Sequence, residues 1–250
     1  MHIAKFLFYI SIKKNDENIE KTLENIENSE NDLELKRNIE KLSIINKEDV
    51  INNSSLYSVE YAFNQENKVI KVNTSGSTGK FMTVNWDKNN MKKSMLSLWT
   101  YRYKYYGIKT TDKLCYFYTV GNVKESIENL KEFEQNGKLL GFSKSNLNNE
   151  RLLKIYNKIC DFKPIWMNLQ PSIAVLLAEY IIKNKLAKIS SLKYIELIGE
   201  MLFDNIRKKI KEAFGCVIAN QYGCYEANSI AFECPFENCI VWNKIYMWKK

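Results

Sequence analysis

A short segment of the sequence has the composition of a phosphate-binding loop. Residues 74–80 are Thr-Ser-Gly-Ser-Thr-Gly-Lys, and they lie between the apolar runs 69–72 and 81–86. Glycine lets the backbone approach a ligand closely, hydroxyl groups donate hydrogen bonds to phosphate oxygens, and a lysine adds a positive charge. We therefore expect a polyphosphate to bind here, to a phosphate loop that comprises Thr74, Ser75, Gly76, Ser77, Thr78, Gly79 and Lys80.

This loop differs from the P-loop of nucleotide hydrolases. That P-loop has four residues between its glycines and a Ser or Thr after the lysine, whereas here Ser77 and Thr78 alone separate the glycines and Phe81 follows Lys80. A hairpin turn rich in Gly, Ser and Thr would have a similar composition. The segment alone leaves both interpretations open.

Two more polar segments follow predicted strands. Gly199 and Glu200 come directly after the apolar run 194–198, and the segment 220–226, Asn-Gln-Tyr-Gly-Cys-Tyr-Glu, follows the apolar run 216–219. Ligands of parallel sheets bind beyond the carboxyl ends of the strands. Both segments are therefore candidates for the same site.

The second of these segments contains an aromatic ring and a carboxylate. Tyr222 could stack on a base, and Glu226 could hold a magnesium ion beside phosphate oxygens. The alternative is structural: Tyr222 would be a core aromatic residue, and Glu226 a solvated acid or the negative charge at a helix N-terminus. The segment by itself favours neither interpretation.

Apolar segments of strand length alternate with amphipathic segments of helix length through most of the chain. This order predicts an α/β fold with a mixed, mainly parallel sheet that is flanked by helices on both faces. The two runs around the phosphate loop predict adjacent antiparallel strands, and Asn46 can cap a short helix. The other predicted strands are 114–120, 164–167, 194–198 and 216–219, and the predicted helices are 91–99, 152–160, 171–182 and 203–214.

The charge of the chain is positive but dispersed. Lys and Arg number 37 against 29 Asp and Glu, which gives a net charge of +8. Because these residues form no dense basic run, nucleic-acid binding is a weak interpretation, and an anionic small molecule fits as well. Residues 1–10 have no leader cleavage site, and no apolar run reaches the ~18 residues of a membrane helix. We therefore expect a cytoplasmic protein without a membrane segment.

Histidine and cysteine limit the chemistry. His2 is the only histidine, so mechanisms with an internal histidine base, such as Ser-His-Asp and Cys-His arrangements, are excluded. The six cysteines are expected to be reduced thiols. Four of them could instead hold a structural zinc ion, although they lack paired C-x-x-C spacing; these are Cys216, Cys224, Cys234 and Cys239.

Residues 74–80 resemble the phosphate loop of the acyl- and aryl-CoA synthetase superfamily of adenylate-forming enzymes, and residues 220–226 resemble its N-x-Y-G-x-T-E signature. The order and separation of the two motifs also match, and the likeness extends over residues 42–235. Shorter matches resemble the phenylacetate-CoA ligase branch, in particular the CapK-type proteins of capsular polysaccharide biosynthesis. They are Phe142-Ser143, Lys163-Pro164, Gln170-Pro171-Ser172 and Gly199-Glu200.

The resemblance implies ATP and Mg²⁺ as cofactors. The loop would close over the β- and γ-phosphates of ATP, Tyr222 would stack on the adenine, and Asn220 would approach its amino group. Glu226 would hold Mg²⁺, and Lys80 and Glu226 are the implied catalytic residues. Besides the loop, the implied cofactor-binding residues are Gly199 and Glu200, which would border the adenine, with Asn220, Tyr222 and Gly223.

The implied reaction is the attack of a small-molecule carboxylate on the α-phosphate of ATP. It gives an acyl adenylate and pyrophosphate, and the acyl group then usually passes to coenzyme A. Because such a reaction depends on positioning and on charge neutralisation at phosphate, it needs no histidine. The chain would thus consist of a helical N-terminal arm (1–45), a partial adenylation domain (46–240) and a short tail (241–250).

The sequence departs from the family pattern at three points. Phe81 replaces the proline that usually follows the loop lysine, and Tyr225 stands where the signature has threonine. No segment resembles the ribose-binding aspartate, the hinge or the mobile C-terminal domain with its catalytic lysine. We therefore expect a C-terminally truncated protein. It would be an enzyme, active alone or completed by a separately encoded C-terminal domain, or a nucleotide-binding remnant of a split or interrupted gene.

Overall fold

The computed structural model describes residues 25, 34, 37, 47–52, 69–73, 82–118, 133–236 and 240–242. These residues form two compact units. Of the described residues, the first unit contains those up to Ser97 together with Tyr225–Asn228 and Trp242, and the second unit contains the others. The phosphate loop and nearly all of the predicted helical arm lie outside the described residues, so the predicted domain boundary at residue 45 stays a prediction.

In the first unit, an antiparallel pair of strands flanks the phosphate loop. β1 (Val69–Asn73) and β2 (Thr83–Asp87) pair along their whole length. β-Branched side chains favour such strands because they pack well on a pleated surface, and the Thr83 hydroxyl donates to Asn73 Oδ1 at 2.8 Å. The predicted antiparallel strands are therefore confirmed. The short helix α4 (Lys47–Asn52) also begins where the sequence predicts one.

The described residues of the second unit are built on a sheet of eight strands. They are β3 (Leu114–Tyr118), β4 (Phe133–Gln135), β5 (Leu139–Ser143), β6 (Trp166–Leu169), β7 (Tyr194–Ile198), β8 (Val217–Cys224), β9 (Asn228–Glu233) and β10 (Ile240–Trp242). Their order is β10-β9-β8-β7-β6-β3-β5-β4. Neighbours from β5 to β8 are parallel, and β4 is antiparallel to β5. The predicted mixed, mainly parallel sheet is thereby confirmed.

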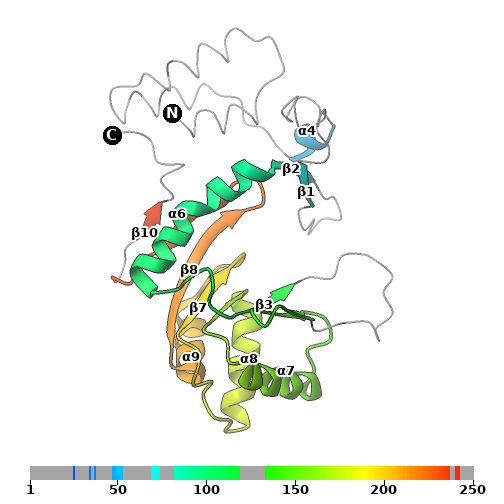
Figure 1. The fold of residues 1–250 in the computed structure, drawn as a ribbon, viewed down its shortest axis with the longest axis vertical. Helices are drawn as coiled ribbons and strands as arrows, with labels where there is room; N and C mark the ends of the chain where they lie inside the picture. The colour runs from blue at the N-terminus through cyan, green and yellow to red at the C-terminus, as the bar shows by residue number, and fades with distance from the viewer. Residues whose placement is uncertain are drawn as a thin grey trace. The chain divides into compact units, whose positions relative to one another are not determined.

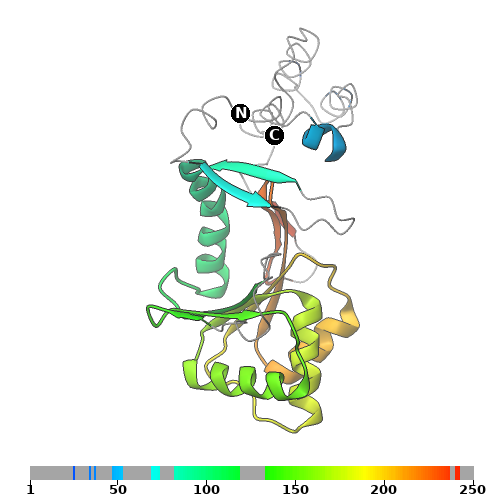
Figure 2. The same ribbon diagram turned by 90° about the vertical axis from the view of Figure 1, so that its right-hand side faces the viewer.

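Three helices cover one face of this sheet (Figures 1 and 2). They are α7 (Asn149–Phe162), α8 (Pro171–Lys183) and α9 (Asp204–Phe214). The side chain of Asn148 caps α7, Pro171 occupies the first turn of α8, and Gly215 ends α9 in a left-handed conformation. Within the described residues, no helix is both long enough and apolar enough to cross a membrane.

The main core lies between these helices and the sheet. Alternate strand residues, such as Met167 of β6 and Ile195 of β7, are fully buried against the helices. The residues between them face the C-terminal half of α6 (Lys88–Tyr106), which covers the other face. Both faces are therefore covered, as the sequence predicts. The cluster on the α6 side comprises Trp99, Tyr106, Ile108, Leu114, Ile165, Trp166, Tyr194 and Ala219.

A buried ion pair joins α6 to the sheet. Arg102 donates from Nε to Glu196 Oε2 at 2.8 Å and from Nη2 to Glu196 Oε1, and the two residues are only 4% and 1% exposed. Asn168 and Tyr194 donate to the same carboxylate at 2.9 and 3.1 Å. The guanidinium also lies 4.8 Å from the ring centroid of Trp166. Because buried charges must be paired and hydrogen-bonded, this pair restricts where α6 can lie on the sheet.

We expect Arg102→Ala to lower the free energy of unfolding by about 3–5 kcal/mol, because it leaves the Glu196 carboxylate buried without its counter-charge. The double variant Arg102→Met/Glu196→Leu should regain most of that loss, since it removes both charges and keeps apolar volume. Urea denaturation followed by circular dichroism measures both. Lys154→Ala, which breaks an exposed pair with Glu150, is the control and should change little. Equal effects of Arg102→Ala and the control would contradict the prediction.

Candidate functional site

The carboxyl ends of the parallel strands of the second unit carry polar residues. β5 is followed by Lys144, β6 by Gln170, and β7 by Gly199 and Glu200. Adjacent parallel strands end at the same edge of a sheet, which is where α/β proteins bind ligands. The sequence predicts Gly199 and Glu200 for this edge, and the structure confirms their place directly after β7. Lys144 and Gln170 were not predicted as site residues.

Gly199 lies in a part of backbone space that favours glycine. Its φ is +77°, and a Cβ built at this position would lie 3.8 Å from Gln170 Cγ, which is ordinary contact. The glycine is therefore required by its conformation and not by a lack of room. The side-chain oxygen of Gln170 is buried and, among the described residues, has no hydrogen-bond partner. A buried acceptor of this kind suits a hydrogen-bond donor of a ligand.

The carboxylate of Glu200 is hydrogen-bonded to the start of α8. It accepts hydrogen bonds from the backbone N–H of Ser172 at 2.9 Å and from the Ser172 hydroxyl at 2.8 Å. Ser172 is in the first turn of α8, where a negative charge is favourable. Burial lowers the pKa of Lys144, and the negative charge of Glu200 opposes part of that shift. Glu200 thus places charge at this edge and fixes the start of α8, while its contact with adenine stays a prediction.

The predicted C-terminal end of β8 was wrong. The sequence predicts a strand that ends at Ala219 and a loop from Asn220 onward, whereas β8 extends to Cys224. Its pairing with β7 ends at Ile198 opposite Gln221, so residues 222–224 extend beyond that register. The polar sequence does not look like a buried strand, but neighbouring β9 supplies a partner on the other side. Strand hydrogen bonds are made by the backbone, and they do not require apolar side chains.

This strand geometry places two predicted site residues on one face. Side chains alternate along a strand, so Asn220 and Tyr222 share a face of β8, and Gly223 lies on the other. Tyr222 is 65% exposed, which excludes the alternative that it is a core aromatic residue. Gly199 follows the last residue of β7 that pairs with β8. The structure therefore brings Gly199, Asn220 and Tyr222 to the same edge of the sheet.

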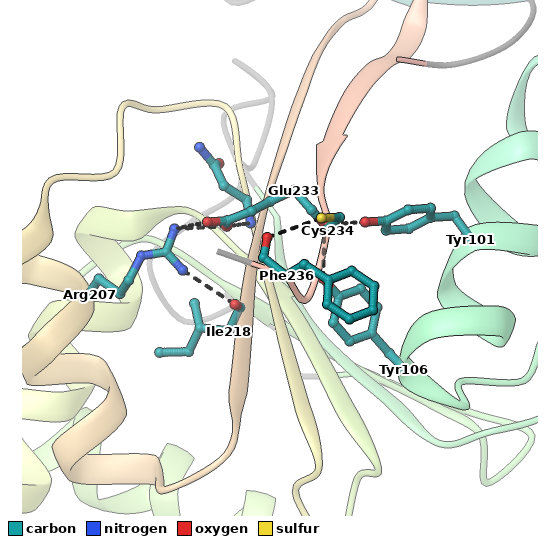
Figure 3. Close-up of polar contacts among 8 residues, drawn as sticks. Tyr101, Tyr106, Arg207, Ile218, Glu233, Cys234 and Phe236 are labelled. Atoms are coloured by element: carbon teal, nitrogen blue, oxygen red, sulfur yellow. Dashed lines mark hydrogen bonds and ion pairs between the residues drawn. The ribbon is translucent and has the colours of Figure 1, made fainter. Parts of the chain in front are cut away.

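The backbone of Asn220 is held by an ion pair that the sequence did not reveal. Its N–H donates to Glu233 Oε2 at 2.8 Å. Arg207 Nη2 donates to both carboxylate oxygens of Glu233 at 2.8 Å (Figure 3). Arg207 Nη1 also donates to the carbonyl of Ile218 at 3.3 Å. These residues come from α9, β8 and the end of β9. No local pattern in the sequence marks such a contact, because it depends on three separate elements.

The main chain of Glu233 has a second set of donors. The hydroxyls of Tyr101 and Tyr106 donate to its carbonyl at 2.7 and 2.8 Å (Figure 3). Burial raises the pKa of Tyr106 to about 12, so this hydroxyl stays protonated and remains a donor at neutral pH. Glu233 is therefore bonded to α9 and β8 through its side chain and to α6 through its backbone.

Glu226 belongs to the first unit, in the turn after β8. In the same unit, the carbonyl of the adjacent Tyr225 accepts a hydrogen bond from Trp86 Nε1 of β2 at 2.7 Å. Asn228 donates to the hydroxyl of Ser94 at 2.7 Å. These contacts attach the Glu226 turn to β2, the strand that follows the phosphate loop in the sequence. Whether Glu226 meets Lys80 stays a prediction, because the loop lies outside the described residues.

The four cysteines considered as a zinc site are not gathered in the described part of the chain. There, no group of three or more His, Cys, Asp or Glu side chains could hold a metal ion, and Cys239 lies outside it. The role of Glu226 toward Mg²⁺ stays a prediction. One carboxylate is compatible with Mg²⁺ that is bound mainly by substrate phosphates.

Comparison with known proteins finds similarity in sequence and in fold. No protein-family model matches the chain. It is 25% identical to Protein CapK of Staphylococcus aureus over 228 residues, which are 88% of this chain and 48% of CapK. In fold it is similar to 2-hydroxyisobutyryl-CoA ligase in complex with 2-HIB-AMP and CoA in the thioesterification state, with a TM-score of 0.59, 16% identity and coverage of 79% of this chain and 43% of the ligase.

The chain has the fold of an adenylate-forming ligase. An open conformation of the same ligase gives a TM-score of 0.57 at 14% identity, over 78% of this chain and 43% of the ligase. The predicted resemblance is thus confirmed in sequence by the similarity to CapK and in fold by the similarity to the CoA ligase. The chain spans about half the length of CapK, at 48%.

We expect the cysteines to differ in reactivity toward a thiol reagent. Burial raises the pKa of Cys216 to about 12 and that of Cys115 further still, so neither forms the reactive thiolate between pH 7 and 9. Cys224 is exposed in β8 and should react first. Timed alkylation at pH 8 with peptide mass spectrometry measures each site, and the protein in guanidinium chloride is the control. Alkylation of Cys115 as fast as Cys224 in the folded protein would refute the assignment.

Proposed function

We propose that this chain binds Mg·ATP and activates a small-molecule carboxylate as an acyl adenylate. The observation that carries the proposal is the shared face of Asn220 and exposed Tyr222 beside Gly199, at the carboxyl edge of a sheet with the ligase fold. A flat, exposed aromatic ring next to a glycine suits the stacking of a base. An asparagine side chain on the same face suits hydrogen bonding to the edge of adenine.

The resemblance assigns the residues that would bind the phosphates of ATP and the magnesium ion. The phosphate loop, with Lys80 as its cation, would hold the β- and γ-phosphates, and Glu226 would hold Mg²⁺, which neutralises charge on the phosphates. The antiparallel strands on either side of the loop and the attachment of the Glu226 turn to β2 support these assignments. Gln170, with its buried carbonyl oxygen, is a further candidate contact for the bound ligand.

The proposed reaction forms one bond and breaks one. A carboxylate oxygen of the substrate attacks the α-phosphorus, and the bond from that phosphorus to the bridging oxygen of pyrophosphate breaks. No proton has to be removed from a carboxylate at neutral pH, so the protein supplies positioning and charge and needs no histidine. We further propose coenzyme A as the acyl acceptor, by analogy with the ligase bound to 2-HIB-AMP and CoA. We also propose a CapK-type role and a cytoplasmic location, and the 25% identity to CapK supports the first of these.

A second candidate function is nucleotide binding without efficient turnover. Tyr225 stands where the signature has threonine, so the compact hydroxyl that the resemblance places near the α-phosphate is replaced by a bulky side chain. Groups that close a site and neutralise charge in the transition state raise the rate, while ground-state contacts alone give binding. A separately encoded C-terminal domain would be the partner that completes the enzyme.

We expect Tyr222→Ala to weaken Mg·ATP binding by about 10- to 100-fold, the usual loss when an aromatic side chain that stacks on a base is removed. The matched control is Tyr103→Ala, because Tyr103 is 62% exposed and Tyr222 is 65% exposed. Isothermal titration calorimetry with Mg·ATP measures both variants and the parent. The stacking assignment is wrong if Tyr222→Ala binds as tightly as Tyr103→Ala.

We also expect the 250-residue chain to bind Mg·ATP, and the two candidates differ in the rate of pyrophosphate release, which is carboxylate-dependent under the first and slow under the second. Pyrophosphate release with a panel of carboxylates, measured on the same preparation as the calorimetry, tests this. Lys80→Ala should abolish binding, because it removes the loop cation. Rapid carboxylate-dependent turnover would eliminate the second candidate. Absence of ATP binding in a folded sample, with Lys80→Ala identical to the parent, would refute both candidates.

A further inference from the structure

The ion pair of Arg207 and Glu233 contacts β8 at two points. β8 is the strand that carries Asn220 and Tyr222, which are predicted to contact adenine. Arg207 contacts β8 directly at the carbonyl of Ile218, at 3.3 Å. It contacts β8 indirectly at Asn220, because the Glu233 oxygen that accepts its Nη2 hydrogen also accepts the Asn220 N–H, both at 2.8 Å. Ile218, Asn220 and Tyr222 are every second residue of β8, so their side chains lie on the same face of the strand. The pair therefore fixes the backbone immediately before the stacking ring.

Neither residue of the pair is deeply buried. The side chains of Arg207 and Glu233 are each 30% exposed, so the pair is partly screened by water. Such a pair contributes modestly to global stability, yet its geometry is defined: the guanidinium donates to both oxygens of one carboxylate. A contact that adds little stability but orients a neighbouring strand is suited to positioning.

Glu233 is itself held in place on its other side. The hydroxyls of Tyr101 and Tyr106 occupy both acceptor positions of its carbonyl, and the ring of Tyr101 packs against Phe232 with centroids 4.2 Å apart. The carboxylate of Glu233 therefore extends from a backbone that α6 holds in place. Figure 3 shows the side chain of Glu233 directed toward Arg207 and its backbone toward the tyrosines.

We propose that Arg207 and Glu233 are positioning residues that set the place of Asn220 and Tyr222 for adenine recognition. This proposal rests on the proposed function. The pair touches no part of the nucleotide in this assignment and acts through the backbone of β8. Its effect should therefore be selective: it should govern affinity for the adenosine part of ATP and leave the phosphate part unchanged.

The test compares two ligands on the same variants. The probes are Mg·ATP and Mg·tripolyphosphate, which lacks the nucleoside, and binding is measured by calorimetry. We expect Arg207→Ala to raise the Kd for Mg·ATP about tenfold, with no change for tripolyphosphate. Glu233→Gln keeps an acceptor for the Asn220 N–H but loses the charge, so its effect should be smaller. The double variant should resemble Arg207→Ala, because the two residues act as one unit.

Two controls separate positioning from general stability. Lys209→Ala lies two residues further along α9 and breaks a pair with Glu179 of α8, so it should leave both affinities unchanged. Arg207→Lys keeps a positive charge and should restore part of the ATP affinity, and it carries the test if Arg207→Ala does not fold. Hydrogen exchange of the β8 peptide should be faster in Arg207→Ala than in Lys209→Ala, because the acceptor of the Asn220 N–H loses its anchor.

Three outcomes would overturn the proposal, and they are distinct. Equal loss of affinity for Mg·ATP and tripolyphosphate would show a general structural role. Unchanged Mg·ATP affinity in Arg207→Ala, with the parent binding normally, would refute positioning and leave the proposed function intact. Failure of the parent chain to bind either ligand would refute the proposed function and, with it, this proposal.

Discussion

The buried ion pair between Arg102 and Glu196 is the constraint on which the second unit depends. A guanidinium and a carboxylate removed from water are costly unless each satisfies the other, so the face of the sheet that carries Glu196 can accept α6 only where Arg102 reaches it. Asn168 and Tyr194 donate to the carboxylate, and the rings of Trp99 and Trp166 lie against the guanidinium. Because Tyr101 and Tyr106 lie on the same helix, this placement also determines where their hydroxyls can donate.

Glu233 connects α6 to the strand that carries the candidate site residues Asn220 and Tyr222. Its carbonyl receives the two tyrosine hydroxyls, and its carboxylate bonds Arg207 and the Asn220 N–H. The Arg102–Glu196 and Arg207–Glu233 ion pairs differ in kind. The first is buried and governs assembly, because a lone charge there would be expensive. The second is partly hydrated, so it can be varied at small cost in stability, and its contribution is geometric.

The covering of both sheet faces leaves the carboxyl edge of the sheet as the place for a ligand-binding site. Helices cover both faces, and the polar residues that follow the strands remain at the carboxyl edge. There Glu200 fixes the start of α8 through Ser172, Gly199 provides a backbone conformation open to few other residues, and the ring of Tyr222 is exposed. An adenylate-forming ligase needs such a site, because its reaction relies on positioning and charge neutralisation more than on acid–base groups.

The sequence by itself determined the local elements and the sheet edge at which the site is proposed. The alternation of apolar runs predicted the parallel sheet, and the position of Gly199 after such a run predicted a strand end, because burial of one or two faces leaves a periodic pattern in the chain. The extension of β8 to Cys224 and the pairing of Arg102 with Glu196, 94 positions away, were decided only by the tertiary structure. A strand can continue through polar residues when a neighbour supplies backbone partners, and two charges far apart in sequence meet only through strand register and helix placement. Neither leaves a periodic signal, since both depend on contacts between elements and not on the residues next to them in the chain.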